Sequence, residues 1–175
     1  MPKLTPPVND HDHAQGPTTA PVTLVEYGDF ECPDCGNAYP IVKALQQQFG
    51  DRLRFVFREF PLQQHPHAEH AAEAAEVAGA QGAFWEMHDM LYTHQRQLAD
   101  PQLLHLASHL PIDQERFRHD LTSHAYAQHV QEDLKSGDQS DVEGTPTFYI
   151  NGQRYDDSYD QATLGAAIEK AMSQA

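Results

Sequence analysis

Cys32 and Cys35 are the only two cysteines of the chain, and they form a C-x-x-C motif with Pro33 and Asp34 between them. The motif follows a strand-like apolar run at 22–27 and precedes a run with helical periodicity. This order predicts that Cys32 lies at a helix N-terminus, where backbone N–H groups and the helix dipole favour a thiolate. Cys35 lies one turn further on and can close a small ring with Cys32. A cysteine pair placed in this way can exchange two electrons with a disulfide of another protein.

The residues around the motif predict a β-α-β unit. An apolar run at 22–27 predicts a strand, residues 35–49 repeat apolar positions at helical spacing, and residues 53–58 predict a second strand. A connection of this length is typical of a right-handed crossover between parallel strands. The unit therefore presents the cysteines where the first strand passes into the helix.

The remaining chain predicts a helical block followed by a second β segment. Residues 62–138 contain only helical patterns, among them an alanine-rich stretch from His67 to Ala80 and a helix with Asp113 as its N-cap. Beyond them, 147–150 is strand-like, Asn151-Gly152 predicts a tight hairpin turn, and a helix over 161–172 closes the chain.

These elements predict an α/β fold interrupted by a helical insertion. We expect residues 1–20 to form an extended N-terminal arm with few ordered contacts. Residues 21–61 and 139–175 would together form the α/β domain, and residues 62–138 an inserted all-helical domain.

Composition excludes several classes of partner. The 175 residues contain 11 basic and 26 acidic side chains, and a formal net charge of −15 argues against nucleic acid or an anionic membrane as a partner. No run is apolar for long enough to span a bilayer, and the first twenty residues contain no signal-peptide core. We therefore expect a cytoplasmic protein, although a chain trimmed of its signal would look the same.

The order of two motifs resembles the DsbA-like branch of the thioredoxin superfamily. C-P-x-C at residues 32–35 is followed, after the helical block, by G-T-P-T-F at residues 144–148, and the resemblance covers the chain from residue 21 onward. It implies a thioredoxin-like fold with an inserted helical domain and a thiol–disulfide oxidoreductase. Its substrates would be cysteine-containing proteins, a separate thiol reductant or oxidant would recycle the pair, and no cofactor is expected.

The resemblance also implies roles for individual residues. Cys32 would be the exposed attacking nucleophile and Cys35 the less exposed resolving thiol. Pro146 corresponds to a cis-proline that faces the cysteines, and Thr145 before it would offer its backbone to an extended substrate segment. Without the resemblance, we would favour a trans proline that opens an edge strand.

Glu26 is a carboxylate within an otherwise apolar strand. Periodicity alone is equally consistent with a solvent-facing position and a buried one. The resemblance favours a buried proton relay beneath Cys35, because a buried carboxyl titrates high and can accept the thiol's proton.

Pro33 and Asp34, between the cysteines, are expected to modulate the pair. Strongly oxidising members of the family carry histidine where this chain has Asp34. An aspartate places a like charge near the Cys32 thiolate, although it also interacts favourably with the helix dipole. We therefore expect a more reducing couple than that of a dedicated oxidase.

Two other functions are compatible with these residues. The twelve histidines and two cysteines could form a zinc-binding interaction module, with His65 and His70 at a suitable spacing from each other, but a complete helix and strand separate Cys35 from His65. We therefore expect no bound metal, and expect most other histidines to lie on the surface. A thioredoxin-fold enzyme that acts on a small molecule through glutathione is the second alternative.

Overall fold

The computed structural model describes residues 1–175 and contains five strands, one 3-10 turn and seven α-helices. In chain order they are β1 (His13–Gln15), β2 (Val22–Gly28), α1 (Pro33–Phe49), η1 (Gly50–Arg52), β3 (Leu53–Glu59), α2 (Ala68–Gly79), α3 (Phe84–Thr93), α4 (Asp100–Ala107), α5 (Gln114–Thr122), α6 (Ala127–Gln139), β4 (Thr147–Ile150), β5 (Gln153–Tyr155) and α7 (Gln161–Gln174). The α/β pattern with an intervening helical block is therefore as expected. None of these helices has both the length and the apolar character needed to cross a membrane.

The chain divides into two units, which are described separately. The first consists of Met1–Gly28, Asn37–Arg58 and Ser136–Ala175, and the second of Asp29–Gly36 and Glu59–Lys135. The sequence suggested that the cysteine motif would belong with the α/β domain. In the structure its residues group with the helical block, because the loop before α1 is held by hydrogen bonds to residues that follow β3.

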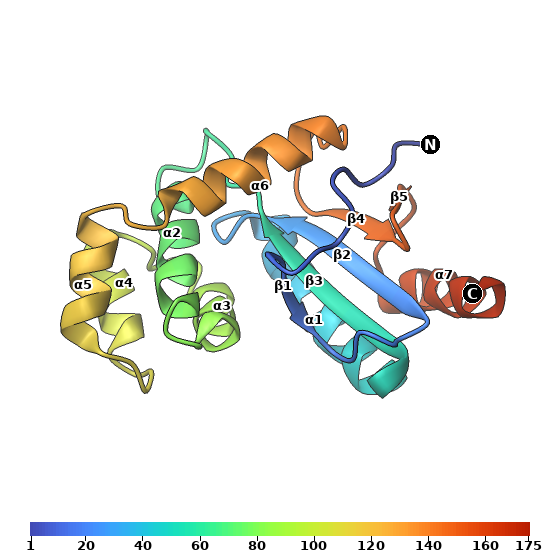
Figure 1. Ribbon diagram of the computed structural model, residues 1–175, viewed down its shortest axis with the longest axis horizontal. Helices are drawn as coiled ribbons and strands as arrows, with labels where there is room; N and C mark the ends of the chain where they lie inside the picture. Colours follow the sequence, from blue (N-terminus) through green and yellow to red (C-terminus); the bar gives the residue numbers. More distant parts are fainter. The chain divides into compact units, whose positions relative to one another are not determined.

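The first unit contains a five-stranded sheet in the order β1-β3-β2-β4-β5 (Figure 1). β4 runs antiparallel to β2, with Glu26 opposite Phe148, and also pairs with β5 as a hairpin. Asn151 and Gly152 both have positive φ angles, 48° and 82°, as the expected tight turn requires.

The core of this unit lies between the sheet and the apolar faces of α1 and α7. Along β2 every residue except Thr23 is buried, and Leu45, Leu164 and Ile168 on the helices have no exposed surface. Gly165 keeps the α7 backbone close to Leu45, whose Cδ2 would lie 3.3 Å from an added Cβ. The same burial holds the strand that leads into the cysteine motif.

The N-terminal segment makes more ordered contacts than the sequence led us to expect. β1 pairs antiparallel with β3, with His13 opposite Phe57, so the segment continues the sheet. Nearer the start, the Leu4 side chain is buried and its N–H donates to Gly152 O at 2.9 Å. Outer strands carry unpaired backbone groups, and this segment satisfies some of them.

The second unit is organised around the alanine-rich helix α2. Nine of its twelve residues are buried, and most of these are alanines, whose small side chains allow neighbouring helices to approach closely. Asp113 caps α5 as expected, because its Oδ1 accepts the N–H of Arg116 at 3.0 Å. The expected helical block is therefore present, without strands between α2 and α6.

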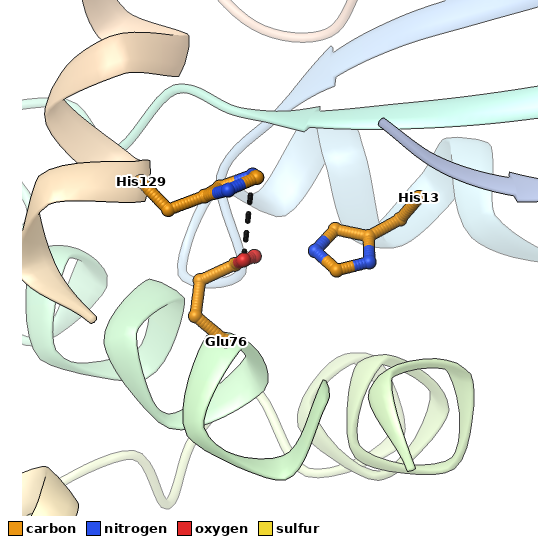
Figure 2. A group of neighbouring side chains, drawn as sticks. All are labelled: His13, Glu76 and His129. Carbon is orange, nitrogen blue, oxygen red and sulfur yellow. Dashed lines mark ion pairs between the residues drawn. The ribbon is translucent and has the colours of Figure 1, made fainter. Parts of the chain in front are cut away.

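An acidic cluster, consisting of Glu59, Glu76 and Asp133, is buried in this unit and contains one basic partner, His129. Asp133 Oδ2 accepts the Glu59 N–H at 2.8 Å. His129 Nε2 lies 3.3 Å from Glu76 Oε1 (Figure 2) and 3.5 Å from Asp133 Oδ2. Burial alone would lower the pKa of His129, but the hydrogen bond to Asp133 and the nearby carboxylates raise it to about 9. Burial and the charges of Glu76 and Asp133 raise the pKa of Glu59 well above its ordinary value.

Because of the acidic cluster, we expect the protein to lose stability as the pH rises. The raised His129 pKa stabilises the folded state fully below about 6.5, and this contribution disappears as the pH passes about 9. The raised Glu59 pKa acts in the same direction, since the unfolded chain releases that proton first. The free energy of unfolding should therefore fall by on the order of 2 kcal/mol between pH 6 and pH 9.

Urea unfolding at both pH values measures this loss. Glu59→Gln removes one titrating group, so the variant should lose less stability over this range than the unmodified protein. His119→Gln, on the exposed surface of α5, is the control and should lose as much as the unmodified protein. Parallel pH profiles for the protein and Glu59→Gln would contradict the assignment.

Candidate active site

Cys32 immediately precedes the first residue of α1, as the sequence predicted. Pro33 occupies the first helical position, where its missing N–H costs no hydrogen bond. Cys32 O accepts the N–H of Gly36 at 3.1 Å, so its carbonyl accepts a hydrogen bond in the first turn of the helix. The Cys32 side chain therefore stands at the positive end of the helix dipole, where negative charge is favoured.

The two cysteines differ in exposure in the expected order. Cys32 retains 6% of its accessible surface and Cys35 none, and no disulfide joins them. Cys32 is less exposed than we expected. Pro33 and Asp34 between them are exposed.

Asp29 holds the loop that carries Cys32. Its backbone oxygen accepts the Cys32 N–H at 3.1 Å. Its carboxylate, which has no exposed surface, accepts the N–H of Glu31 at 2.7 Å and the N–H of Leu62 at 2.9 Å, and contacts His65 Nδ1 at 2.7 Å. No sequence motif singled out Asp29. The signal for its turn-forming role was its position directly after a strand, where aspartate commonly accepts an N–H two residues on.

Phe30 anchors the same loop among aromatic side chains of α3. Its ring lies 4.9 Å from that of Tyr92 and 5.7 Å from that of His88, measured between centroids. Phe84 and Tyr92 of the same helix are also buried. Phe30 therefore fixes the loop at the residue after Asp29.

Gln95, which no sequence motif indicated, directly contacts the loop at residues 29–32 that carries Cys32. We call this segment the cysteine loop. Its amide nitrogen donates to Cys32 O at 2.8 Å and to Phe30 O at 2.9 Å. An added Cβ at Gly36 would lie 2.0 Å from Gln95 Oε1, so glycine at this position leaves room for the amide. No sequence pattern points to Gln95, because it lies 63 residues from Cys32.

Gln95→Ala should loosen the cysteine loop. The change removes two hydrogen bonds to backbone carbonyls, each contributing about 0.5–1.5 kcal/mol, so the free energy of unfolding should fall by roughly 1–2 kcal/mol. Gly36→Ala should have a similar effect, because the new methyl group would displace the amide. Chemical denaturation measures both variants. The control is Gln97→Ala, an exposed residue in the loop between α3 and α4 that also contains Gln95, and an equal loss in it would show that the two hydrogen bonds are not responsible.

Glu26, Thr145 and Pro146 belong to the first unit. Glu26 is 2% exposed in the middle of β2, so the solvent-facing alternative is excluded. The Thr145–Pro146 peptide bond is cis, and both residues are partly buried directly before β4.

The histidines considered for zinc hydrogen-bond to different carboxylates. His65 contacts Asp29, and His70 Nδ1 contacts Asp100 Oδ1 at 2.5 Å. Elsewhere in the second unit, Glu76, His129 and Asp133 offer donor atoms of the kinds that divalent metals accept. His129 is at the same time the cation that balances these carboxylates, so a metal there would have to displace its proton.

Comparison with protein families assigns the fold. A family model described as thioredoxin matches residues 8–170, nearly the whole chain. The chain belongs to the thioredoxin family. Among solved structures, oxidised BdbD from Bacillus subtilis is 26% identical, with a TM-score of 0.85 over 93% of this chain and 94% of that one. A thioredoxin-like oxidoreductase from Silicibacter pomeroyi is 24% identical, with a TM-score of 0.84 over 95% of both chains.

The thioredoxin fold seen here is of the DsbA-like type, with helices inserted between β3 and β4. The thiol–disulfide exchange protein α-DsbA2 from Wolbachia pipientis is 18% identical, with a TM-score of 0.81 over 93% of this chain and 88% of that one. This likeness shows the shared fold. The family resemblance and the fold class read from the sequence are therefore confirmed.

Curated relatives that match nearly the whole of this chain are named as antiporters. A protein of Salinispora arenicola named Na(+)/H(+) antiporter NhaA 1 is 49% identical over 171 residues, which are 97% of this chain and 26% of that protein. Another, named Na(+)/H(+) antiporter NhaA, from Herminiimonas arsenicoxydans, is 44% identical over 95% of this chain and 27% of its own length. The chain thus spans about a quarter of the length of these relatives.

Proposed function

We propose that the protein is a thiol–disulfide oxidoreductase that exchanges the Cys32–Cys35 pair with cysteines of protein substrates. The observation that carries the proposal is the pair itself, at the first turn of α1 in a thioredoxin fold. Cys32 stands directly before the helix and Cys35 is enclosed within it. The structural relatives named as oxidoreductases or thiol–disulfide exchange proteins support the same class.

In the reductive direction, the Cys32 thiolate attacks one sulfur of a substrate disulfide. A bond forms between the two sulfurs, the substrate disulfide breaks, and its other sulfur leaves as a thiolate that takes up a proton. Cys35 then loses its proton and attacks Cys32. This step releases the second substrate thiolate and leaves the Cys32–Cys35 disulfide, so two electrons have passed to the substrate. An external thiol reductant restores the pair, and oxidation of a substrate runs through the same steps in reverse.

Five other residues have proposed parts in this reaction. Glu26, buried within β2, accepts the Cys35 proton during resolution. Thr145 and the cis-linked Pro146 bind an extended substrate segment through the Thr145 backbone. Pro33 and Asp34 adjust the balance between the dithiol and the disulfide.

Glu26→Gln tests the proton relay. The change keeps the shape of the side chain and removes only its titration, so turnover should slow while the protein stays folded. The pH profile of disulfide reduction measures it. An unaltered profile would show that Glu26 has only a structural role.

Insulin reduction tests the function. The protein, with dithiothreitol as recycling thiol, should accelerate precipitation of the insulin B chain, and Cys32→Ser should abolish the acceleration. Conjugation of glutathione to an electrophile without insulin reduction would instead support the small-molecule enzyme. Thiols that react only after a chelator is added would support the zinc-binding module.

The transport named for the curated relatives concerns proteins of which this chain matches about a quarter. The redox function proposed here concerns only the part that this chain represents. The cytoplasmic location and the recycling partner stay predictions.

A further inference from the structure

His65 is the ionisable side chain held beside the cysteine loop by Asp29. It lies between β3 and α2, with 21% of its side chain exposed, and its Nδ1 contacts Asp29 Oδ2 at 2.7 Å. The carboxylate of Asp29 has no exposed surface and is fixed by two backbone N–H groups of its own unit. A hydrogen bond between an imidazole and a buried, fixed carboxylate favours the charged imidazolium.

We propose that His65, as an imidazolium held by Asp29, stabilises the Cys32 thiolate and shifts the redox couple toward the dithiol. The inference rests on the proposed redox function and deepens it by naming a positioning residue that sets the direction of exchange. The effect opposes that expected of Asp34, which is exposed and therefore more strongly screened by solvent.

Three residues of the loop that carries Cys32 place charge near His65: Asp29, Glu31 and Cys32 itself. Burial alone would lower the pKa of His65, but the hydrogen bond and charge of Asp29 raise it, and the charges of Cys32 and Glu31 raise it further. Such an interaction is reciprocal: a thiolate that stabilises the imidazolium is itself stabilised to the same extent. Glu31 also accepts the N–H of His67 at 3.1 Å, which directs its carboxylate toward the start of α2.

The effect of His65 on the redox equilibrium depends on which form of the protein, dithiol or disulfide, carries the thiolate charge. The thiolate exists only in the reduced protein, so stabilising it favours the dithiol and makes the disulfide a stronger oxidant. In the oxidative direction, the imidazolium also makes Cys32 a better leaving group when the second substrate thiolate attacks the substrate sulfur of the mixed disulfide. His65 takes no proton from either sulfur in this scheme and acts by its charge alone.

The first test uses the unmodified protein. The imidazole of His65 is titrated by NMR in the dithiol and in the disulfide form. Its titration midpoint should be higher in the dithiol form, by roughly half a pH unit or more, because only that form carries the thiolate. The midpoint in Cys32→Ser should match the disulfide form. Equal midpoints in the dithiol and disulfide forms would overturn the inference without any question of folding.

The second test measures the redox equilibrium of His65→Gln with glutathione. The equilibrium should shift about tenfold toward the disulfide form of the protein, which for two electrons corresponds to ~30 mV. The shift should be largest near pH 7 and vanish at a pH where His65 is neutral in the unmodified protein. A shift of constant size across this range would indicate a structural effect and would overturn the inference. His119→Gln, on the exposed surface of α5, is the matched control and should show no shift.

Failure of this inference can be distinguished from failure of the proposed function, because neither measurement requires a protein substrate. A protein that fails to reduce insulin but shows different His65 midpoints would contradict the function and retain the charge coupling. Active insulin reduction with equal midpoints would retain the function and remove His65 from it.

Discussion

Cys35→Ser should accumulate mixed disulfides between Cys32 and substrate proteins, whereas Cys32→Ser should accumulate none. In the first variant Cys32 still attacks from the start of α1, but the thiol that resolves the bond is missing. In the second variant the remaining thiol has no accessible surface, so it cannot reach a partner. Both variants should lose essentially all turnover, and this is the largest effect expected on activity.

Non-reducing gels of each variant, mixed with a protein that carries an accessible disulfide, measure the trapping. Adding dithiothreitol should dissolve the adducts and serves as the control for their chemistry. Equal trapping by the two variants would show that the assignment of attacking and resolving cysteines is wrong.

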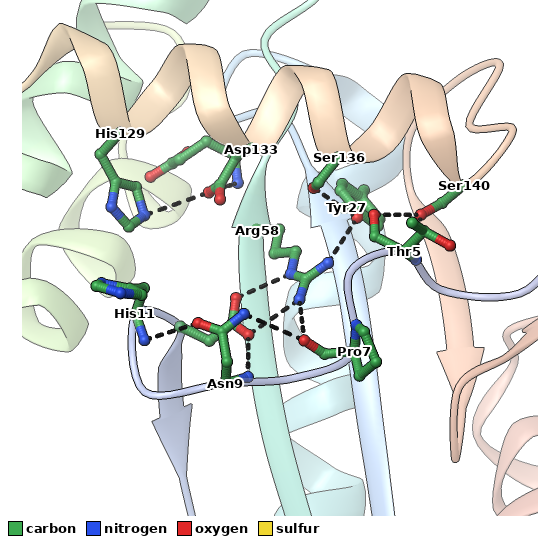
Figure 3. Close-up of polar contacts among 12 residues, drawn as sticks. Thr5, Pro7, Asn9, His11, Tyr27, Arg58, His129, Asp133, Ser136 and Ser140 are labelled. Carbon is green, nitrogen blue, oxygen red and sulfur yellow. Dashed lines mark hydrogen bonds and ion pairs between the residues drawn. The ribbon is translucent and has the colours of Figure 1, made fainter.

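Asp12→Ala should cause the largest loss of stability, about 3–5 kcal/mol. Arg58 is 1% exposed, and its guanidinium donates to Asp12 Oδ1 at 2.8 Å and Asp12 Oδ2 at 3.0 Å. It also donates to Tyr27 Oη at 2.9 Å and to Pro7 O at 3.3 Å (Figure 3). Removing Asp12 leaves a buried positive charge without its counter-ion, which is far more costly than losing an exposed ion pair.

Urea denaturation of two further variants separates this effect from ordinary ion pairing. Asp156→Ala breaks the pair between Arg154 and the exposed Asp156, which has a similar 2.7 Å separation, and should cost no more than about 1 kcal/mol. The double change Asp12→Leu with Arg58→Met should recover most of the stability lost in Asp12→Ala, since no buried charge remains. A double variant as unstable as Asp12→Ala would show that packing, and not the unpaired charge, dominates.

The Arg58 interactions also explain why the N-terminal segment is ordered. The sequence of residues 1–20, rich in proline and charge, gives no sign of burial. Arg58, however, lies in a buried strand, and Asp12 compensates its charge. An aspartate 46 residues away supplies the counter-ion, and β1 follows along the edge of β3. Single-sequence patterns cannot reveal such a pairing, because the two residues lie 46 positions apart.

The amino-acid sequence by itself determined the elements whose causes are local. The strand before the cysteines, the helix that contains Cys35, the turn at Asn151-Gly152 and the cap at Asp113 follow from side-chain periodicity and backbone preference within a few residues. The chemical type of the site, a cysteine pair at a helix start, was predictable for the same reason.

Only the tertiary structure decided what surrounds that pair. Asp29 contacts His65 across 36 residues of sequence, and Gln95 reaches Cys32 across 63. Each of these contacts depends on the position of the loop that follows β3 or α3. A buried polar group must find a partner, but which of many polar residues becomes that partner depends on the path of the whole chain. For this reason the cysteines could be found from their spacing, whereas the side chains that set their charge and hold their loop could not.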